Sequence, residues 1–249
     1  MKISIITVCF NAADTITATL RSVAAQTHQE AEHIVVDGGS TDGTLEHIAK
    51  HGKHVAHLVS EPDKGIYDAM NKGIRLASGD IIGILNADDI YADDAVLTRV
   101  ANVMADGGFD ALYGDVEFFA PDNPKKATRR YNSRRFSPAK LAWGWMPAHP
   151  TLFLRRELFE RYGLYRTDFR ISGDYELIAR IFKEGKLKYR YLPEVLVRMR
   201  TGGVSTSGWR NTLLLNREVL RACSENGIKT NWFKLLSKYP LKALEFLRK

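Results

Sequence analysis

Short apolar runs alternate with stretches of helical periodicity through the first half of the chain. Each run has the length of a strand and is rich in Ile, Val and Leu, which is typical of strands buried on both faces of a parallel sheet. Between the runs, apolar side chains recur every three or four residues, which indicates amphipathic helices. Four strands are predicted in this half, at residues 3–10, 33–37, 55–59 and 81–85.

The first two helices have recognisable start signals. Asp14 is placed to cap a helix that runs to Ala24, and Ser40 or Thr41 to cap a helix that runs through Ile48. The alternation of strands and helices predicts an α/β fold with a right-handed, Rossmann-like, mostly parallel sheet flanked by helices. Further helices are predicted at residues 66–77, 93–104, 156–162 and 175–183, and further strands at 111–113, 116–119, 152–154 and 189–199.

The composition fits one α/β domain with a C-terminal appendage. The 249 residues are 45% hydrophobic, enough to bury a full core. Cys9 lies inside the first strand and Cys223 near the end, so a reducing compartment is indicated rather than a disulfide framework. The first apolar run is too short for a signal peptide, and no segment has the ~18 apolar residues of a spanning helix. A cytoplasmic protein is therefore predicted.

Charge is divided unevenly along the chain, although the formal net charge is only +7. Residues 1–122 have 19 acids and 8 Lys or Arg, whereas residues 123–249 have 10 acids and 28 Lys or Arg. The acidic half suits metal binding. The basic half suits nucleic acid, acidic lipid headgroups or a pyrophosphate substrate. The densest basic run, residues 125–135, can equally be a solvated loop.

Two adjacent acids, Asp88 and Asp89, follow the apolar run at 81–85. Open α/β sheets hold their ligands at the carboxyl ends of such strands. Mg²⁺ and Mn²⁺ prefer oxygen ligands and share them with phosphate groups, so one acid is expected to bind a divalent cation. Side chains alternate along a strand, so the other acid is expected to cap or orient the loop. Paired acids are also common helix caps, and this alternative stays open.

Another polar segment, Asp37-Gly38-Gly39-Ser40, closes the strand at 33–37. An acid here can accept hydrogen bonds from a base or ribose, and the glycines let a ligand approach the backbone closely. A glycine-rich turn with a helix cap is the alternative. A dinucleotide enzyme would need Gly-x-Gly-x-x-Gly after the first strand, where Phe10-Asn11-Ala12-Ala13 stands. A nicotinamide or flavin enzyme is therefore not expected.

The helix predicted at 66–77 carries a further polar group. Asp68, Asn71 and Arg75 fall at helical spacing after a Gly-containing loop, so one helix face could contact a ligand. A polar face turned to solvent is the alternative for these residues.

Together these segments resemble the family 2 inverting glycosyltransferases, which have the GT-A fold. The resemblance covers about residues 1 to 200 and implies a nucleotide-diphosphate sugar as donor, a UDP-sugar being favoured, and a hydroxyl acceptor. It implies Mn²⁺ or Mg²⁺ as cofactor and no nucleic acid as partner. The order and spacing of the segments are far more specific than any one piece: Ser4-Ile5-Ile6-Thr7-Val8-Cys9-Phe10-Asn11, Val35-Val36-Asp37-Gly38-Gly39-Ser40-Thr41-Asp42-Gly43-Thr44, Gly79-Asp80 and Leu85-Asn86-Ala87-Asp88-Asp89.

Carried over position by position, the resemblance places Asp37 near the nucleoside and Asp88 on the cation that bridges the diphosphate. Gly38 stands where many relatives have a second acid, and Asn86 stands where many have an acid. With the helix face and the cations of the second half, the residues expected to bind the donor are Asn11, Asp37, Gly39, Asp68, Asn71, Arg75, Asn86, Ala87, Asp88, His149 and Arg200.

The resemblance also implies a catalytic base at Asp174, within residues 171–177. Inversion at an anomeric carbon requires in-line attack, so a carboxylate has to take the proton of the acceptor hydroxyl. Asp174 also has the pattern of an N-cap ahead of an apolar helix, and this alternative stays open. His149 resembles the family's residue that faces the donor site, and a structural histidine is its alternative. Arg200 precedes a Gly-rich loop at 202–207 that could close over a diphosphate.

The final segment, residues 229–249, contains 6 Lys or Arg and one acid. Its apolar positions follow helical spacing opposite the lysines, which is typical of a basic amphipathic helix. Such a segment can lie on an anionic membrane face. A helix docked on the domain is the alternative.

We therefore predict a GT-A glycosyltransferase domain at 1–205, with a nucleotide-sugar and metal part at 1–122 and an acceptor part at 123–205, and a basic helical segment at 206–249. The predicted enzyme transfers one sugar, with inversion, to a lipid-linked or oligosaccharide intermediate of surface polysaccharide synthesis, in the cytoplasm or peripherally at the inner face of the cell membrane. The Gln-x-x-Arg-Trp motif of processive synthases is missing. The alternatives are a sugar-nucleotide nucleotidyltransferase, whose glycine-rich loop residues 10–17 lack, and a noncatalytic nucleotide- or polyanion-binding module.

Overall fold

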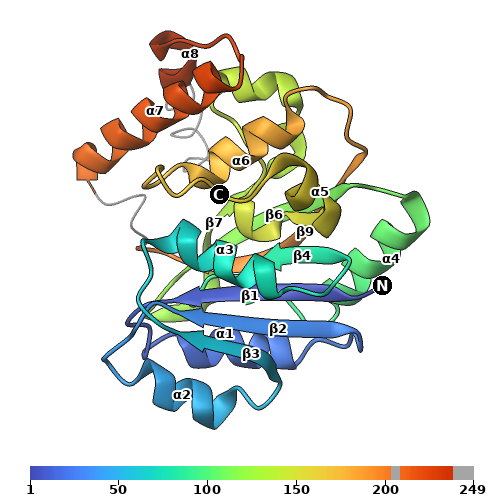
Figure 1. Ribbon diagram of the computed structural model, residues 1–249, viewed down its shortest axis with the longest axis vertical. Coiled ribbons are helices and arrows are strands. Elements are labelled where there is room, and N and C mark those ends of the chain that lie inside the picture. The colour runs from blue at the N-terminus through green and yellow to red at the C-terminus, as the bar shows by residue number, and fades with distance from the viewer. Residues whose placement is uncertain (203–207, 238–249) are drawn as a thin grey trace.

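The structure is a computed structural model that describes residues 1–202 and 208–237 (Figure 1). Its first half contains β1 (Ile3–Cys9), α1 (Ile16–Ala24), β2 (Ala31–Asp37), α2 (Thr44–His51), β3 (Val55–Ser60), α3 (Ile66–Leu76), β4 (Ile81–Ile84), β5 (Asp89–Tyr91), α4 (Val96–Gly107) and β6 (Ala111–Ala120). The second half contains β7 (Asn123–Tyr131), the 3₁₀ helices η1 (Ser133–Arg135), η2 (Pro138–Trp143) and η3 (His149–Thr151), β8 (Phe153–Arg155), α5 (Arg156–Tyr162), α6 (Gly173–Phe182), β9 (Tyr189–Arg200), α7 (Gly208–Glu225) and α8 (Trp232–Leu236).

The described strands form one 9-stranded mixed sheet in the order β3-β2-β1-β4-β8-β6-β9-β5, with β7 paired to β6. β1, β2, β3 and β4 are parallel to one another, and β6 and β9 form a further parallel pair. β8 lies antiparallel between β4 and β6, while β5 and β7 pair antiparallel with β9 and β6. The predicted α/β fold with a sheet flanked by helices is confirmed, but only the first four strands form an all-parallel set, because β5, β7 and β8 pair antiparallel with their neighbours.

Alternating side chains of the buried strands supply both faces of the sheet. In β2, Ile34 and Val36 pack in the core cluster that includes α3 and α6. The intervening Val35 packs against Ile16 of α1 and Ile48 of α2. Figure 1 shows the result, with α1 and α2 on one side of the sheet and α3, α5 and α6 on the other. Burial on both faces explains why the first strands are apolar throughout.

The C-terminal helices share the core of the sheet domain. Val219, Ala222 and Cys223 of α7, and Leu235 of α8, belong to the same buried cluster as the α6 side chains. The docked-helix alternative is therefore confirmed for the described part of the basic segment. Residues 238–249 of that segment and 203–207 of the Gly-rich loop lie outside the described residues. The division of the chain at residue 205 stays a prediction.

Two predicted helix caps are wrong. α1 begins at Ile16 and Asp14 lies exposed, two residues ahead of it, without a capping role. α2 begins at Thr44 after Gly43, which has a left-handed φ of 93°. Ser40 does not cap α2, because its hydroxyl donates to the buried carboxylate of Asp37 at 2.5 Å. The loop conformation is thus set by the buried acid rather than by the helix that follows.

The basic run at 125–135 is a strand and a 3₁₀ turn rather than a solvated loop. β7 forms a hairpin with β6, and Arg130 donates to the fully buried carboxylate of Asp115 from Nε at 3.0 Å and from Nη2 at 2.7 Å. Asp115 also accepts from the Ser133 N–H and from the Tyr191 hydroxyl, both at 2.9 Å. One buried acid, Asp115, therefore anchors this basic run to the sheet.

A buried histidine connects β1, β2 and the segment before β3. His33 Nε2 pairs with Thr7 Oγ1 at 2.9 Å and Nδ1 pairs with His54 Nε2 at 3.0 Å. Burial, together with the neighbouring His54, lowers the pKa of His33 to about 3. The folded protein therefore holds His33 neutral at pH values where an unfolded chain would protonate it.

The stability of the fold is expected to fall as pH drops below about 6.5, the unfolded-state pKa of histidine. The unfolded state binds the additional proton, so His33 contributes a loss of about 1.4 kcal/mol per pH unit until its folded pKa is approached. Urea unfolding at pH 7.5, 6.5 and 5.5 measures this slope. His33→Gln should lower stability at pH 7.5 and flatten the slope, while the exposed His57→Gln keeps it. Equal slopes in His33→Gln and the parent would contradict this assignment.

Candidate functional site

The predicted site residues gather where β1, β2 and β4 end. In a sheet of this kind the carboxyl ends of parallel strands form the ligand-binding edge. The loop after β2 carries Asp37 and Gly39, the loop after β1 carries Asn11, and the turn after β4 carries Asn86 and Asp88. Their common edge follows from the parallel register of β1 with β2 and β4.

Asp37 holds the loop that follows β2. Its buried carboxylate accepts from the N–H groups of Gly39 and Ser40 at 3.1 and 3.0 Å, from the Ser40 hydroxyl and from the Ser60 hydroxyl at 2.7 Å. Burial alone would raise the pKa of Asp37, but the hydrogen bonds from Ser40 and Ser60 outweigh it and hold the pKa below its usual range. The acid is therefore ionised and fully enclosed, and its role in nucleoside binding remains a prediction.

Asn11 and Asp63 lie on either side of this loop. Asn11 has a left-handed φ of 49°, and its Oδ1 accepts from the Thr41 N–H at 3.0 Å. Asp63, from the loop after β3, fills the space beside Gly38: a Cβ on Gly38 would lie 2.5 Å from Asp63 Oδ2. Asp63 thus brings a carboxylate to the position where many relatives have a second acid after Asp37. The sequence does not point to Asp63, because it lies more than 20 residues after Gly38.

Asp88 and Asp89 differ in burial. Asp88 is half-buried; burial raises its pKa, and the nearby cation of Arg200 offsets part of this rise. Asp89 begins β5 and is only 1% exposed, and burial, followed by the negative charge of Asp88, raises its pKa well above the usual range. Within the described residues, neither carboxylate oxygen of Asp89 nor Oδ1 of Asn86 has a hydrogen-bond partner of good geometry.

These oxygens fit a divalent cation that is shared with a ligand. No group of three or more His, Cys, Asp and Glu side chains comes together in the described chain. A cation bound with a diphosphate, however, needs only one or two protein carboxylates, since phosphate oxygens and water supply the remaining ligands. Asp88 provides such a carboxylate beside the unpartnered oxygen of Asn86, and Arg200 adds a positive charge to the same place.

Asp174 lies in the first turn of α6. Its Oδ1 accepts from the Tyr175 N–H at 2.7 Å and from the Tyr67 hydroxyl at 3.4 Å. Burial raises the pKa of Asp174, and the nearby His149 offsets part of the rise. The N-cap position of α6 belongs to Ser172, so the interpretation of Asp174 as the helix cap is wrong. A half-buried carboxylate with a raised pKa is suited to accepting a proton near neutral pH.

Aromatic residues enclose Asp174. The Tyr67 hydroxyl donates to the Ile171 carbonyl at 2.6 Å, and the Tyr67 ring stacks on Tyr165 with centroids 5.7 Å apart. A Cβ on Gly173 would lie 2.7 Å from the Tyr67 ring, so this close packing requires glycine. His149 is buried, with Nε2 paired to the Tyr165 hydroxyl at 2.7 Å, and burial lowers its pKa. His149 is therefore neutral near pH 7 and belongs to the wall around Asp174.

Two residues of the predicted α3 face do not reach the ligand edge. Asn71 is buried, donating to the Tyr165 carbonyl at 2.7 Å and accepting from the Tyr165 N–H at 2.9 Å. Its amide is thus fully used in joining α3 to the chain before α6. Arg75 lies in the last turn of α3, and a helix that leads into a parallel strand ends at the opposite edge of the sheet. The fold therefore does not bring Asn71 and Arg75 together with the predicted donor-binding residues of the strand ends. Asp68, in the first turn, accepts from the Lys64 N–H at 3.0 Å.

Glu218 of α7 positions the chain that leads to Asp174. This buried carboxylate accepts from three consecutive N–H groups, those of Arg170 at 2.8 Å, Ile171 at 2.9 Å and Ser172 at 2.8 Å. Three charge-assisted hydrogen bonds from one carboxylate fix a backbone segment strongly. The sequence offers no signal for this role, since its partners are 46 to 48 residues upstream.

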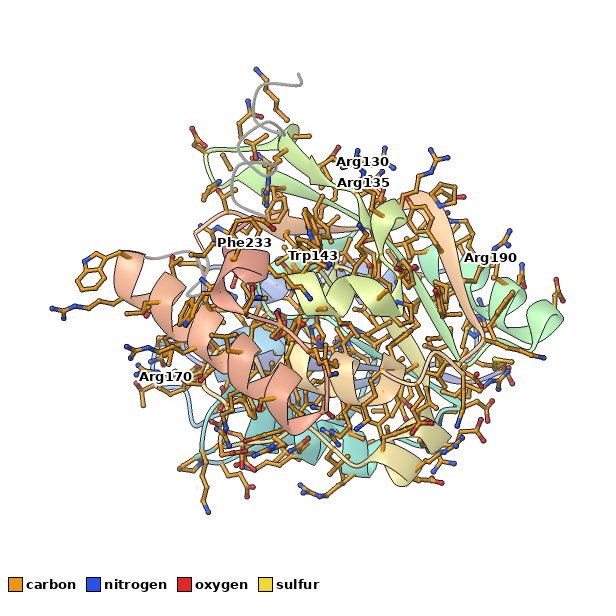
Figure 2. The ribbon with its side chains drawn as sticks, turned by 90° about the horizontal axis from the view of Figure 1, so that it is seen from above. Arg130, Arg135, Trp143, Arg170, Arg190 and Phe233 are labelled. Carbon is orange, nitrogen blue, oxygen red and sulfur yellow. The ribbon has the colours of Figure 1, made fainter. Side chains whose placement is uncertain are left out.

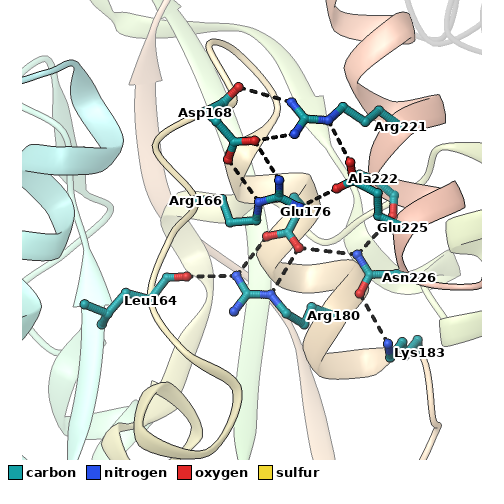
Figure 3. A network of polar contacts seen from close by, with 10 residues as sticks. All are labelled: Leu164, Arg166, Asp168, Glu176, Arg180, Lys183, Arg221, Ala222, Glu225 and Asn226. Carbon is teal, nitrogen blue, oxygen red and sulfur yellow. Dashed lines mark hydrogen bonds and ion pairs between the residues drawn. The ribbon is translucent and has the colours of Figure 1, made fainter.

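A neighbouring network joins α7 to the same loop at a greater distance from Asp174. Asp168 pairs with Arg166 at 2.6 Å and with Arg221 of α7, and Arg221 pairs with Glu225 at 2.9 Å (Figure 3). These side chains are largely exposed, so each pair is worth little by itself. Glu218 therefore fixes this segment more strongly than the exposed ion pairs do.

A mixed α/β sheet whose first four strands are parallel, with acids at their carboxyl ends, is typical of proteins that bind nucleotides. Residues 4–163 match the sequence profile described as glycosyl transferase family 2. The chain belongs to this family, which argues against the nucleotidyltransferase alternative.

Curated relatives support the assignment. An uncharacterized glycosyltransferase of Mycobacterium tuberculosis is 36% identical over 181 residues, which are 72% of this chain and 68% of the relative. A PGL/p-HBAD biosynthesis glycosyltransferase of Mycobacterium bovis is 32% identical over 209 residues, which are 82% of this chain and 79% of the relative.

Solved structures confirm the GT-A fold. Staphylococcus aureus TarS in complex with UDP matches with a TM-score of 0.67 at 18% identity, covering 91% of this chain and 65% of that one. A mannosyltransferase of Pyrobaculum calidifontis in complex with GDP-Man and Mn²⁺ matches with a TM-score of 0.66 at 22% identity, covering 88% and 64%. The chain thus spans slightly less than two thirds of these solved proteins.

Replacing Glu218 by Gln should slow sugar transfer about tenfold or more while leaving nucleotide affinity within about twofold. The amide keeps the shape but places an NH₂ group against backbone donors, so the segment bearing Asp174 loses its fixed position. Steady-state rates and nucleotide titration by calorimetry separate the two quantities.

Glu225→Gln is the matched control, since it removes an exposed acid from the same helix. It should keep the parent rate. If both variants lose thermal stability equally and neither changes the rate, Glu218 is a structural residue only.

Proposed function

We propose that the protein is an inverting, metal-dependent glycosyltransferase that moves one sugar from a nucleotide-diphosphate sugar to a hydroxyl acceptor. The observation that carries the proposal is Asp174, a carboxylate of raised pKa held by Glu218 and Tyr67 at the rim of a family 2 fold. We infer that the acceptor belongs to surface polysaccharide synthesis and is a lipid-linked or oligosaccharide intermediate.

Asp174 is the proposed base. Its carboxylate takes the proton of the acceptor hydroxyl as that oxygen bonds to the anomeric carbon, and the bond from this carbon to the diphosphate breaks on the opposite face. The proton ends on Asp174 and the electron pair leaves with the nucleoside diphosphate. A raised pKa favours this role, because a stronger base accepts the proton more readily. Below the raised pKa the carboxyl is protonated, so the rate should fall as pH decreases.

Asp88 is the proposed holder of the divalent cation, with Asp89 supporting the turn. A bound cation would neutralise charge that develops on the departing diphosphate. Arg200 would add a second positive charge beside it. Mn²⁺ is favoured over Mg²⁺ only by the mannosyltransferase neighbour, whose complex contains Mn²⁺.

The donor is proposed to lie over the loops that carry Asn11, Asp37, Gly39 and Ala87. Gly39 has a left-handed φ of 85° and no side chain, so a ligand can approach its backbone. Solved neighbours have been captured with UDP, UDP-GlcNAc and GDP-Man. We favour a UDP-sugar for this chain.

A membrane-facing surface is proposed at α8 and η2. Phe233 is 78% exposed, and Trp232 and Leu236 beside it are also exposed. Lys234 of α8 lies 5.7 Å from the ring centre of Trp143 in η2, which joins the two elements into one aromatic and basic surface (Figure 2). Exposed aromatic side chains with lysines are typical of proteins that lie on anionic lipid. In the part of the chain described, no helix has the length and apolarity to cross a membrane.

Asp174→Asn should reduce sugar transfer by roughly 10²- to 10⁴-fold and leave nucleotide binding intact. Asp88→Asn is the matched variant: it should lose both transfer and the stabilisation by UDP with Mn²⁺. Thermal shifts with UDP or GDP, with and without Mn²⁺, measure binding because a ligand of the folded state raises its stability. A parent protein that shows no metal-dependent shift with any nucleotide would refute the proposal, and a fully active Asp174→Asn would refute the base.

Vesicle flotation tests the membrane surface. The protein should bind vesicles of phosphatidylcholine with phosphatidylglycerol, and Phe233→Asp should weaken this binding about tenfold or more, because a charge replaces an apolar anchor. Leu58→Asp, an exposed apolar position on β3, should bind like the parent. Equal binding by both variants would contradict this surface, as would a Phe233-dependent dimer that ignores vesicles.

A further inference from the structure

A hollow of about 170 Å³ lies between the start of α3 and the chain that leads into α6. Lys64, Ile66 and Tyr67 form one wall, and Asp168, Phe169 and Arg170 belong to the other. At roughly 30 Å³ per water molecule this volume holds about five waters, the size of a small polar group rather than of a polymer. No residue of this hollow is used by the nucleotide or the cation in the proposed reaction, apart from Tyr67 as the partner of Asp174.

The charge of the hollow is positive. Lys64 and Arg170 are both exposed, and neither has a carboxylate within ion-pair distance among the described residues. The one acid in the lining, Asp168, is already paired with Arg166 at 2.6 Å and with Arg221 (Figure 3). Of the acids nearest to Lys64 in sequence, Asp68 lies 4.0 Å from the Lys72 ammonium and accepts from the Lys64 N–H, and Asp63 accepts from the Gly65 N–H. Lys64 and Arg170 thus line one hollow, and neither is paired with a carboxylate among the described residues.

The hollow adjoins the proposed base. Tyr67 lines it, and the hydroxyl of the same residue donates to the Ile171 carbonyl at 2.6 Å and lies 3.4 Å from Asp174 Oδ1. A group bound here is therefore separated from Asp174 by a single side chain. The nucleotide edge, by contrast, is formed by loops that follow β1, β2 and β4.

Both walls are held in place before any ligand arrives. Glu218 fixes the main chain of Arg170 through its N–H at 2.8 Å, and Asp68 fixes that of Lys64 at 3.0 Å. Phe169 is buried, with Arg166 and Arg221 packed 4.9 and 4.5 Å from its ring centre. Fixed main chains reduce the entropy lost on binding, because the positions from which the two cationic side chains extend are set before an anion binds.

We infer that this hollow is an acceptor subsite, and that the acceptor carries an anionic group, a carboxylate or a phosphate, next to the hydroxyl that is glycosylated. This inference rests on the proposed function. Arg170 can bind either anion through two parallel hydrogen bonds, and Lys64 adds a point charge. Ile66 contributes an exposed apolar surface that a sugar ring can cover.

The test measures binding of small acceptor probes to protein that is already saturated with UDP and Mn²⁺. Glucuronic acid presents a carboxylate, glucose 6-phosphate presents a phosphate, and glucose is the neutral match. At least one anionic probe should bind about tenfold more tightly than glucose, measured by calorimetry. Lys64→Met combined with Arg170→Leu should abolish this preference. The control is Arg75→Leu, which removes a cation from the opposite end of α3 and should keep the preference.

The outcomes separate the subsite from the reaction. Preference for glucuronic acid or for glucose 6-phosphate supports the subsite and identifies the anion as carboxylate or phosphate. Equal binding of all three probes to the UDP-bound protein overturns the subsite and leaves the glycosyltransferase proposal standing. The subsite is also overturned if the anionic probes bind the free protein but not the protein saturated with UDP, because they then occupy the nucleotide site. Failure of UDP itself to bind would instead refute the proposed function.

Discussion

A carboxylate that is removed from water has to find hydrogen-bond donors or give up its charge, and this constraint organises the protein. Asp37 and Glu218 are buried and satisfied by main-chain N–H groups, with hydroxyls added at Asp37. Asp115 is buried and satisfied by the Arg130 guanidinium, the Ser133 N–H and the Tyr191 hydroxyl. Each of these three acids fixes a loop beside the ligand edge: the turn after β2, the hairpin of β6 and β7, and the approach to α6. The parallel sheet brings the strand ends together, and the satisfied acids hold the loops that extend from them.

Three other carboxylates are buried or half-buried without comparable satisfaction. Burial raises the pKa of Asp88, Asp89 and Asp174, and the donors near each of them are too few to reverse the rise. The ionised forms of these three acids are therefore less stable than those of the acids that anchor loops. In the proposed reaction a cation would relieve Asp88 and a proton would relieve Asp174, so the electrostatic cost of the site would be recovered only when the reactants are present.

The sequence predicted what depends on local pattern. The alternation of apolar runs and helical periodicity located the first strands and α3, and the bounds of α5 agree with residues 156–162. The sequence could not predict contacts between residues that lie far apart along the chain. Helical spacing put Asn71 on a polar face of α3, but its amide donates to the carbonyl of Tyr165, 94 residues away. β5 has only 3 residues and is defined by its pairing with β9. The cap predicted at Ser40 is wrong for the same reason, because its hydroxyl donates to the buried Asp37 instead of capping α2.

The C-terminal segment shows the same limit of the sequence, because in the fold it is part of the domain core rather than an appendage. Its periodicity and basic charge describe an appendage, and nothing in a run of helical sequence distinguishes Glu218 from an exposed acid. In the fold, Glu218 is the residue through which α7 reaches the main chain of residues 170–172. Tyr67 of α3 reaches the same segment from the opposite side, at the Ile171 carbonyl. The proposed base Asp174 and Arg170 therefore share one support, built from helices that begin more than 140 residues apart, so the proposed acceptor side of the site can form only after α7 has docked.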